Sequence, residues 1–133
     1  MELQHQPTLV LALGNEDASS TMAGILWLKG CVVFKSNSAS DCVEQINRLH
    51  GKVDVLVVSS EIALDRNAML IINIKKMHLN TKILVIGEEN SDKTRILDYG
   101  ADEFALKPMS PENTADKILM LLARDKVAEN RAD

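Results

Sequence analysis

Polar side chains stand at several points where an apolar run of the sequence ends, and each has a chemical use. The run DVLVV (54–58) stops at Ser59, the loop GNED (14–17) follows an early apolar run, and Lys107 follows a late one. Paired carboxylates can hold Mg²⁺, and an ammonium can bind phosphate or carboxylate oxygens. A serine hydroxyl becomes a nucleophile only beside a base. What these groups do together depends on whether the fold brings them to one place.

The elements that must position these residues alternate along the chain. Short apolar runs typical of buried strands are separated by segments whose apolar residues recur at helical spacing. The third helix is expected from Arg66 to His78, with Met77 on its buried side. The strands are expected at 8–13, 31–34, 53–58, 82–86 and 102–106.

Capping residues mark the expected helix starts. The first helix, which ends near Lys29, is capped by Asp17, Ser19 or Ser20. The second starts at Ser38, and the last starts at Ser110, which is followed by a proline. Serine and aspartate suit these positions because their side-chain oxygens accept hydrogen bonds from free backbone N–H groups of the first turn.

Continuously apolar strands that alternate with helices imply a parallel sheet covered on both faces. Right-handed crossovers then favour a doubly wound α/β fold. In such sheets the functional crevice lies beyond the carboxyl ends of the strands. The polar residues expected at this crevice lie at 14–17, Ser59 and Ser60, Gly87 and Glu88, and Lys107.

The composition indicates one domain, residues 1–133, with a core from about 8 to 125 and a polar tail at 126–133. The net charge of −4 gives no general attraction to nucleic acid or anionic lipid. The sequence has no apolar run of the roughly 18 residues that span a membrane and no signal-peptide pattern. A cytoplasmic protein is expected.

Three residues outside the crevice have two interpretations each. Cys31 and Cys42 lie in apolar segments and are expected to be reduced core thiols, with a disulfide as the alternative. Trp27 stands between two leucines and is expected in the core, with a contact to a partner as the alternative.

One stretch resembles a known family. The segment GADEFALKPMSPE (100–112) is similar to the end of a response-regulator receiver domain, and the predicted elements follow that family's order from about Thr8 to Leu122. The resemblance implies a (βα)5 flavodoxin-like, three-layer sandwich with a parallel sheet of order 2-1-3-4-5. The residues that carry it are Gly100, Ala101, Asp102, Phe104, Lys107, Pro108, Ser110, Pro111 and Glu112.

The resemblance also implies roles for crevice residues. Members of the family phosphorylate an aspartate that ends the third strand, hold Mg²⁺ with two acids after the first strand, and keep a hydroxyl after the fourth and a lysine after the fifth. In the family an aspartate also starts the third strand, and the acceptor follows it five residues later. Asp54 is that first aspartate here, so Ser59 stands at the acceptor position. Gly87 replaces the hydroxyl residue, and Lys107 is kept. The acidic positions fall on Gly14 and Asn15, on Asn15 and Glu16, or on Glu16 and Asp17.

These replacements predict a degenerate phosphoacceptor pocket. An aspartate is ionised near pH 7, whereas a serine needs a base, and the three histidines lie away from the strand ends. Without the acceptor carboxylate Mg²⁺ would be held weakly. We expect no self-phosphorylation, no enzymatic activity, no metal and no cofactor. The pocket residues are Asn15, Glu16, Asp17, Ser59, Gly87 and Lys107.

Two pocket residues are expected to make local contacts. Ser59 is expected to hydrogen-bond within its own segment, and the alternative is modification by a separate kinase. Lys107 is expected to pair with Glu16 or Asp17, or to bond Ser59, because an unpaired buried charge is costly. A relic anion site is the alternative for Lys107.

The expected function is that of a stand-alone pseudo-receiver that signals by binding another protein. The resemblance implies a docking face made by the fourth helix, the fifth strand and the fifth helix. Gly87 has no hydroxyl to couple a phosphate to Phe104, so one fixed ring rotamer is expected. The partner would be a histidine kinase, regulator or output protein, bound by a monomer or weak dimer, without nucleic acid or membrane. The residues of the face are Lys93, Asp102, Phe104 and Pro108.

Two other functions are kept open. One is a phospho-accepting single-domain response regulator that uses Glu16, Asp17 and Lys107 with an unusual acceptor. The other is a flavodoxin-like ligand binder that uses the loop at 14–20, although this loop lacks the repeated glycines of a phosphate-binding motif.

Overall fold

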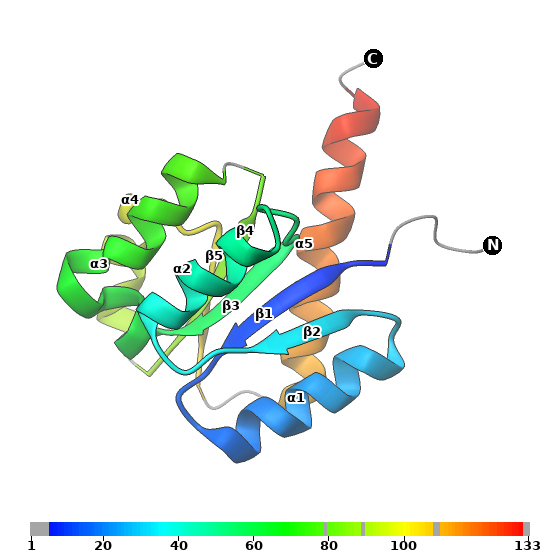
Figure 1. The fold of residues 1–133 in the computed structure, drawn as a ribbon, viewed down its shortest axis with the longest axis horizontal. Coiled ribbons are helices and arrows are strands. Elements are labelled where there is room, and N and C mark those ends of the chain that lie inside the picture. The colour runs from blue at the N-terminus through cyan, green and yellow to red at the C-terminus, as the bar shows by residue number, and fades with distance from the viewer. Residues whose placement is uncertain (1–5, 79, 89, 108–109, 132–133) are drawn as a thin grey trace.

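The computed structural model describes residues 6–78, 80–88, 90–107 and 110–131. Five strands alternate with five helices, as Figure 1 shows. The strands are β1 (Thr8–Ala12), β2 (Val32–Lys35), β3 (Val55–Ser59), β4 (Lys82–Gly87) and β5 (Glu103–Leu106). The helices are α1 (Glu16–Leu28), α2 (Ala39–Arg48), α3 (Ser60–Met77), α4 (Lys93–Tyr99), preceded by a 3-10 turn (Asn90–Asp92), and α5 (Pro111–Arg131).

The sheet is parallel throughout and has the order β2-β1-β3-β4-β5, which confirms the predicted topology. Every residue of the central strand β3 is buried. A strand covered on both faces must be apolar at every position, and the run from Val55 to Val58 meets this requirement.

The core has two layers, one on each face of the sheet. Side chains alternate along a strand, so Val10 joins the layer under α2, α3 and α4, while Leu9 and Leu11 join the layer under α1 and α5 (Figure 1). The two buried cysteines follow the same division: Cys42 belongs to the first layer and Cys31 to the second. Both are free thiols, as predicted, and burial raises the pKa of Cys42 to about 12.

The helix starts agree with the sequence for α2 and α5 but not for α1. Ser38 and Ser110 accept hydrogen bonds from the N–H groups of Asp41 (3.1 Å) and Asn113 (3.0 Å). The prediction for α1 was wrong, because Asn15 is the cap and accepts from the Ala18 N–H at 3.0 Å. An asparagine is as good a cap as aspartate or serine. Its position puts two acidic residues into the first turn, where the helix dipole favours them.

The third helix differs most from its prediction. It begins at Ser60, capped by Ser59, and a break in the helix contains Arg66. The predicted start at Arg66 was therefore wrong. Arg66, Asn67 and Ala68 have φ values of 52°, 58° and 62°, so the chain makes a left-handed turn. This conformation costs roughly 1–2 kcal/mol for each residue with a side chain. The apolar spacing predicted the second half of α3 but gave no sign of the first half or of the break.

Two apolar residues are more exposed than predicted. Trp27 is 69% exposed, so the core assignment was wrong. It follows Leu26, which is fully buried, and one step along a helix turns a side chain by about 100° away from the sheet. Met77 is 50% exposed at the end of α3 rather than on its buried side. No helix in the described part of the chain is long and apolar enough to cross a membrane.

Candidate functional site

The carboxyl ends of β1, β3, β4 and β5 meet at one edge of the sheet. The register pairs Ala12 with Val58, Ser59 with Ile86, and Gly87 with Leu106. A methyl group added to Gly14 would lie 3.9 Å from Ser59 Oγ, so the loop after β1 passes directly beside the serine. The fold therefore brings Gly14 and Ser59 side by side. Gly87, the last residue of β4, lies on the strand next to β3.

Ser59 closes the end of β3 and starts α3. Its side chain is only 6% exposed, and its Oγ accepts a hydrogen bond from the Ile62 N–H at 3.5 Å. The predicted local hydrogen bond is confirmed. A hydroxyl held in this way satisfies a backbone donor at the helix start and offers little surface to a second enzyme.

Gly87 ends β4 directly under the ring of Phe104. A Cβ atom at residue 87 would lie 2.7 Å from both Cε1 and Cζ of that ring, and 3.4 Å from the Ser60 Cβ. Contacts of 2.7 Å between carbon atoms are far inside their van der Waals distance. The ring is itself 6% exposed. Phe104 therefore points inward and fills the space that a side chain at residue 87 would need.

Of the acidic residues after β1, Glu16 is paired with the edge strand β2. Glu16 accepts hydrogen bonds from Lys35 Nζ on the edge strand at 2.8 Å and from Ser20 Oγ at 3.3 Å. The hydrogen bond and charge of Lys35, together with Ser20, lower the pKa of Glu16. Asp17 is exposed, and the Asn15 amide oxygen is used as the helix cap. Among the described residues, no group of three Asp, Glu, His or Cys side chains could hold a metal ion.

Lys107 makes a different ion pair from the one predicted. Its Nζ lies 3.8 Å from Glu88 Oε1, whereas Glu16 is paired with Lys35. The prediction assumed a buried ammonium that needs a partner, but the Lys107 side chain is 46% exposed. Water solvates it, so its ion pair is long and weak. Lys107 is placed beside Glu88 because its N–H donates to the Gly87 carbonyl at 2.8 Å, which continues the β4–β5 ladder.

The predicted docking residues are not equally placed. Lys93 is exposed at the first turn of α4. Asp102 pairs with Lys75 of α3 at 2.5 Å and accepts from the Ile83 N–H at 2.8 Å, so its carboxylate joins the amino end of β4 to α3. Pro108 lies outside the described residues. The sequence did not predict the Lys75–Asp102 pair, since helical spacing alone shows a lysine on the polar side of α3.

Comparison with solved structures decides which fold this is. A signal receiver domain from Vibrio parahaemolyticus superposes with a TM-score of 0.82 at 13% identity, over 97% of this chain and 99% of that one. A receiver domain from Clostridium thermocellum gives 0.78 at 13% identity, over 92% and 98%. The fold is that of a response-regulator receiver domain.

A third similar structure is HP1043, an orphan response regulator of H. pylori, with a TM-score of 0.77 at 21% identity over 87% of this chain and 96% of that one. The sequence itself matches no protein-family model and no curated protein. With the receiver fold established, the crevice described above is the edge at which the phosphoacceptor pocket was predicted. Of the six predicted pocket residues, Ser59 and Gly87 lie in the crevice, Lys107 reaches its rim, and Glu16 points to β2 instead.

Proposed function

We propose that this protein is a pseudo-receiver: a receiver-fold signalling protein that binds another protein and does not use aspartyl phosphorylation. The observation that carries the proposal is Ser59, which occupies the end of β3 with its oxygen engaged by the Ile62 N–H. No carboxylate stands at that position, and the nearby acid Glu16 is paired with Lys35. On this proposal the protein is not an enzyme.

The state of Phe104 supports a signal that does not depend on phosphate. A receiver that switches needs a group at the end of β4 that moves with the phosphate, and Gly87 has no side chain to move. The inward ring over Gly87 leaves no room for another residue there. We expect Phe104 in a single rotamer, and binding that is constitutive or set by the amount of partner.

The proposed docking face is formed by α4, β5 and α5. Leu106 is 42% exposed at the end of β5, and Met120 is exposed on α5, so this face offers apolar contacts. Lys93 adds a positive charge at the start of α4. Asp102 is less suited to this role because it is paired with Lys75. The partner class is a signalling protein such as a histidine kinase, a regulator or an output protein.

Incubation with Mg²⁺ and acetyl phosphate, followed by intact-mass spectrometry, tests the proposal. We expect no gain of a phosphoryl group, while an ordinary receiver treated in parallel gains one. The Ser59→Asp variant is the matched probe, since aspartate caps a helix as well as serine does and restores the acceptor. It too should stay unmodified, because Glu16 remains paired with Lys35.

The natural protein and the Ser59→Asp variant test different parts of the proposal. Stoichiometric phosphorylation of the natural protein would overturn the proposal and favour a response regulator with an unusual acceptor. Phosphorylation of Ser59→Asp alone would mean that a metal site survives, and would contradict the loss of the acidic pair.

A further inference from the structure

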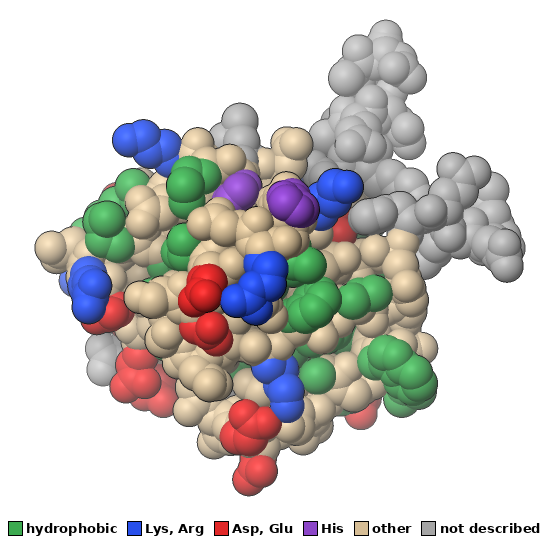
Figure 2. Space-filling model, viewed as in Figure 1, with side chains coloured by type: hydrophobic (Ala, Val, Ile, Leu, Met, Phe, Trp, Pro, Cys, Tyr) green, Lys and Arg blue, Asp and Glu red, His purple; other side chains and the backbone are tan. Residues whose placement is uncertain are grey.

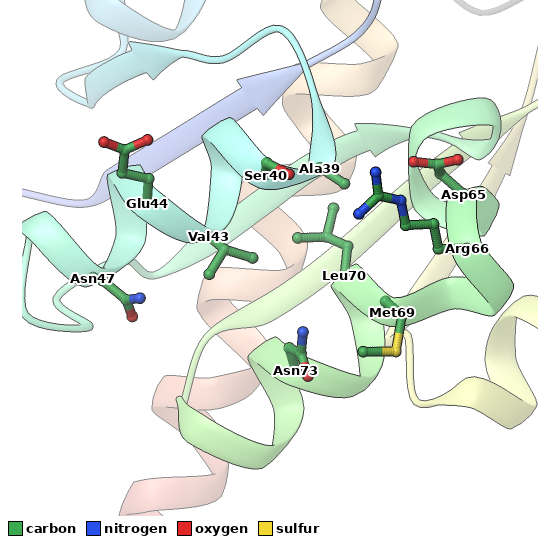
Figure 3. Close-up of a pocket in the computed structure, with 10 residues that line it drawn as sticks. All are labelled: Ala39, Ser40, Val43, Glu44, Asn47, Asp65, Arg66, Met69, Leu70 and Asn73. Atoms are coloured by element: carbon green, nitrogen blue, oxygen red, sulfur yellow. The ribbon is translucent and has the colours of Figure 1, made fainter.

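A groove of about 450 Å³ lies between α2 and α3, on the sheet face opposite α1 and α5. Its apolar lining includes Leu70, which is fully buried, and Ala39 and Val43, which are partly buried. Figure 3 shows that the labelled side chains of both helices surround one space. The residues that line it are Ala39, Ser40, Val43, Glu44, Asn47, Asp65, Arg66, Met69, Leu70 and Asn73.

Exposed apolar residues of α3, called the α3 stripe below, extend from the groove toward the end of that helix. Met69, Ile72 and Met77 are 46%, 38% and 50% exposed. The nine residues from Met69 to Met77 span about 12 Å along a helix. Figure 2 shows hydrophobic side chains over this part of the surface. A stripe of this length exceeds what a small compact ligand would cover.

A positive charge stands near each end of the stripe. Within the described residues, neither Arg66 nor Lys76 makes an ion pair. Of the two acids that line the groove, Glu44 is already paired with Arg48 at 3.2 Å. Asp65 remains next to Arg66. The groove and stripe together therefore offer apolar contacts between two available cations.

The backbone break in α3 places the first of these cations. Arg66 lies in the left-handed turn, and in Figure 3 its guanidinium points across the groove toward α2. A continuous right-handed helix would give the residue a different direction. A strained turn built from residues with side chains persists only where the surrounding structure holds it, and such turns gather at binding sites.

We propose that the α2–α3 groove and the α3 stripe bind an amphipathic helix of a partner protein whose apolar residues are flanked by carboxylates. Proteins commonly recognise an amphipathic helix by binding its apolar face in a hydrophobic groove. Exposed methionines suit such a site because their flexible side chains adapt to varied apolar partners. The carboxylates would face Arg66 and Lys76, and the amides of Asn47 and Asn73 would remain at the rim. This surface lies apart from the α4–β5–α5 face and does not rest on the function proposed for it.

Two synthetic helical peptides test the charge rule. The first carries leucines at positions i, i+3, i+4 and i+7 with glutamates in its first and last turns, and its twin carries lysines in place of the glutamates. Each is titrated into the ¹⁵N-labelled full chain and followed by amide chemical shifts. We expect the shifts to map to α2 and α3, and the glutamate peptide to bind at least about tenfold more tightly than its twin.

Three variants test the site itself. Met69→Asp should weaken binding of the glutamate peptide by roughly tenfold or more. Leu28→Asp is the matched control, since Leu28 is also exposed but lies on α1, and it should leave binding unchanged. Arg66→Asn removes the charge with a residue that tolerates a left-handed backbone, and should reduce the preference for glutamate over lysine. The amide spectrum of each variant reports whether it is folded.

Several results would overturn the proposal. They are shifts that map elsewhere, equal affinity for both peptides, or equal effects of Met69→Asp and Leu28→Asp. Sedimentation of the protein without peptide covers one further outcome: a dimer that Met69→Asp dissociates would make a second copy of this chain the occupant.

Discussion

The crevice at the carboxyl ends of the strands and the groove between α2 and α3 differ in how their side chains are engaged. In the crevice, Ser59 caps α3, and Phe104 covers Gly87. In the groove, Arg66 has no ion pair among the described residues, and Met69 is 46% exposed. The crevice is internally satisfied, while the groove leaves apolar area and charge available to a partner.

The two regions also differ in which residues have positive φ. The crevice loop has its positive φ at Gly14 (+75°), where a glycine adopts it at no steric cost. The groove has positive φ at Arg66, Asn67 and Ala68, where each side chain adds strain. Of these two regions, only the groove retains strain that a glycine would relieve. This contrast indicates that the identity of the side chains matters there.

Adding a methyl group at Gly87 is the largest expected effect. The Gly87→Ala variant places Cβ 2.7 Å from two ring carbons of Phe104, and overpacking of this kind costs about 1–3 kcal/mol. Urea unfolding measures the change in the free energy of unfolding. Gly24→Ala is the matched control: its Cβ meets nothing within 4 Å, and in a helix it should stabilise by roughly 0.5–1 kcal/mol.

A double-mutant cycle identifies the ring as the cause. In a Phe104→Ala background the space above residue 87 is open, so Gly87→Ala should lose most of its cost. If the effects of the two substitutions on the free energy of unfolding simply add, Phe104 does not fill this space. The contrast between a filled crevice and an open groove would then be wrong.

Arg66→Gly has a smaller expected effect and the opposite sign. Glycine adopts the left-handed conformation freely, and after its greater freedom in the unfolded chain is subtracted the gain is about 0.5–1 kcal/mol. The same variant should bind the glutamate peptide more weakly. Lys76→Gly, in the right-handed part of α3, is the control and should destabilise by roughly 1 kcal/mol. Destabilisation by both glycines would mean that the turn at Arg66 carries no strain.

The fold could be predicted because apolar periodicity reports burial directly. The continuously apolar run from Val55 to Val58 predicted a buried strand, and the capping serines Ser38 and Ser110 predicted two helix starts. The resemblance of residues 100–112 to receiver domains then supplied the strand order. These features depend on local sequence, and the structure agrees with them.

The contacts of the site could not be predicted in the same way. The partner of Lys107 depends on its exposure, and Lys35 reaches Glu16 only because β2 lies at the edge beside β1. The left-handed turn at Arg66 contains no glycine, which is the usual signal for positive φ. Trp27 was misplaced because three successive apolar residues do not show which of them faces the sheet.

The smallest effect concerns Glu16, the acid that left the crevice. Its pKa is lowered in the folded protein by the hydrogen bond and charge of Lys35. Stability from this contact is therefore present above the unfolded pKa of the carboxyl and is lost as the pH falls through the folded pKa. The side chain is exposed, so the change in stability should be too small for unfolding experiments, whereas carboxyl ¹³C shifts should resolve it. Lys35→Met should raise the pKa of Glu16, and Lys107→Met should not. If the pKa of Glu16 rises with Lys107→Met instead, Glu16 contacts Lys107 in the crevice. That result would weaken the case against an acidic pair there.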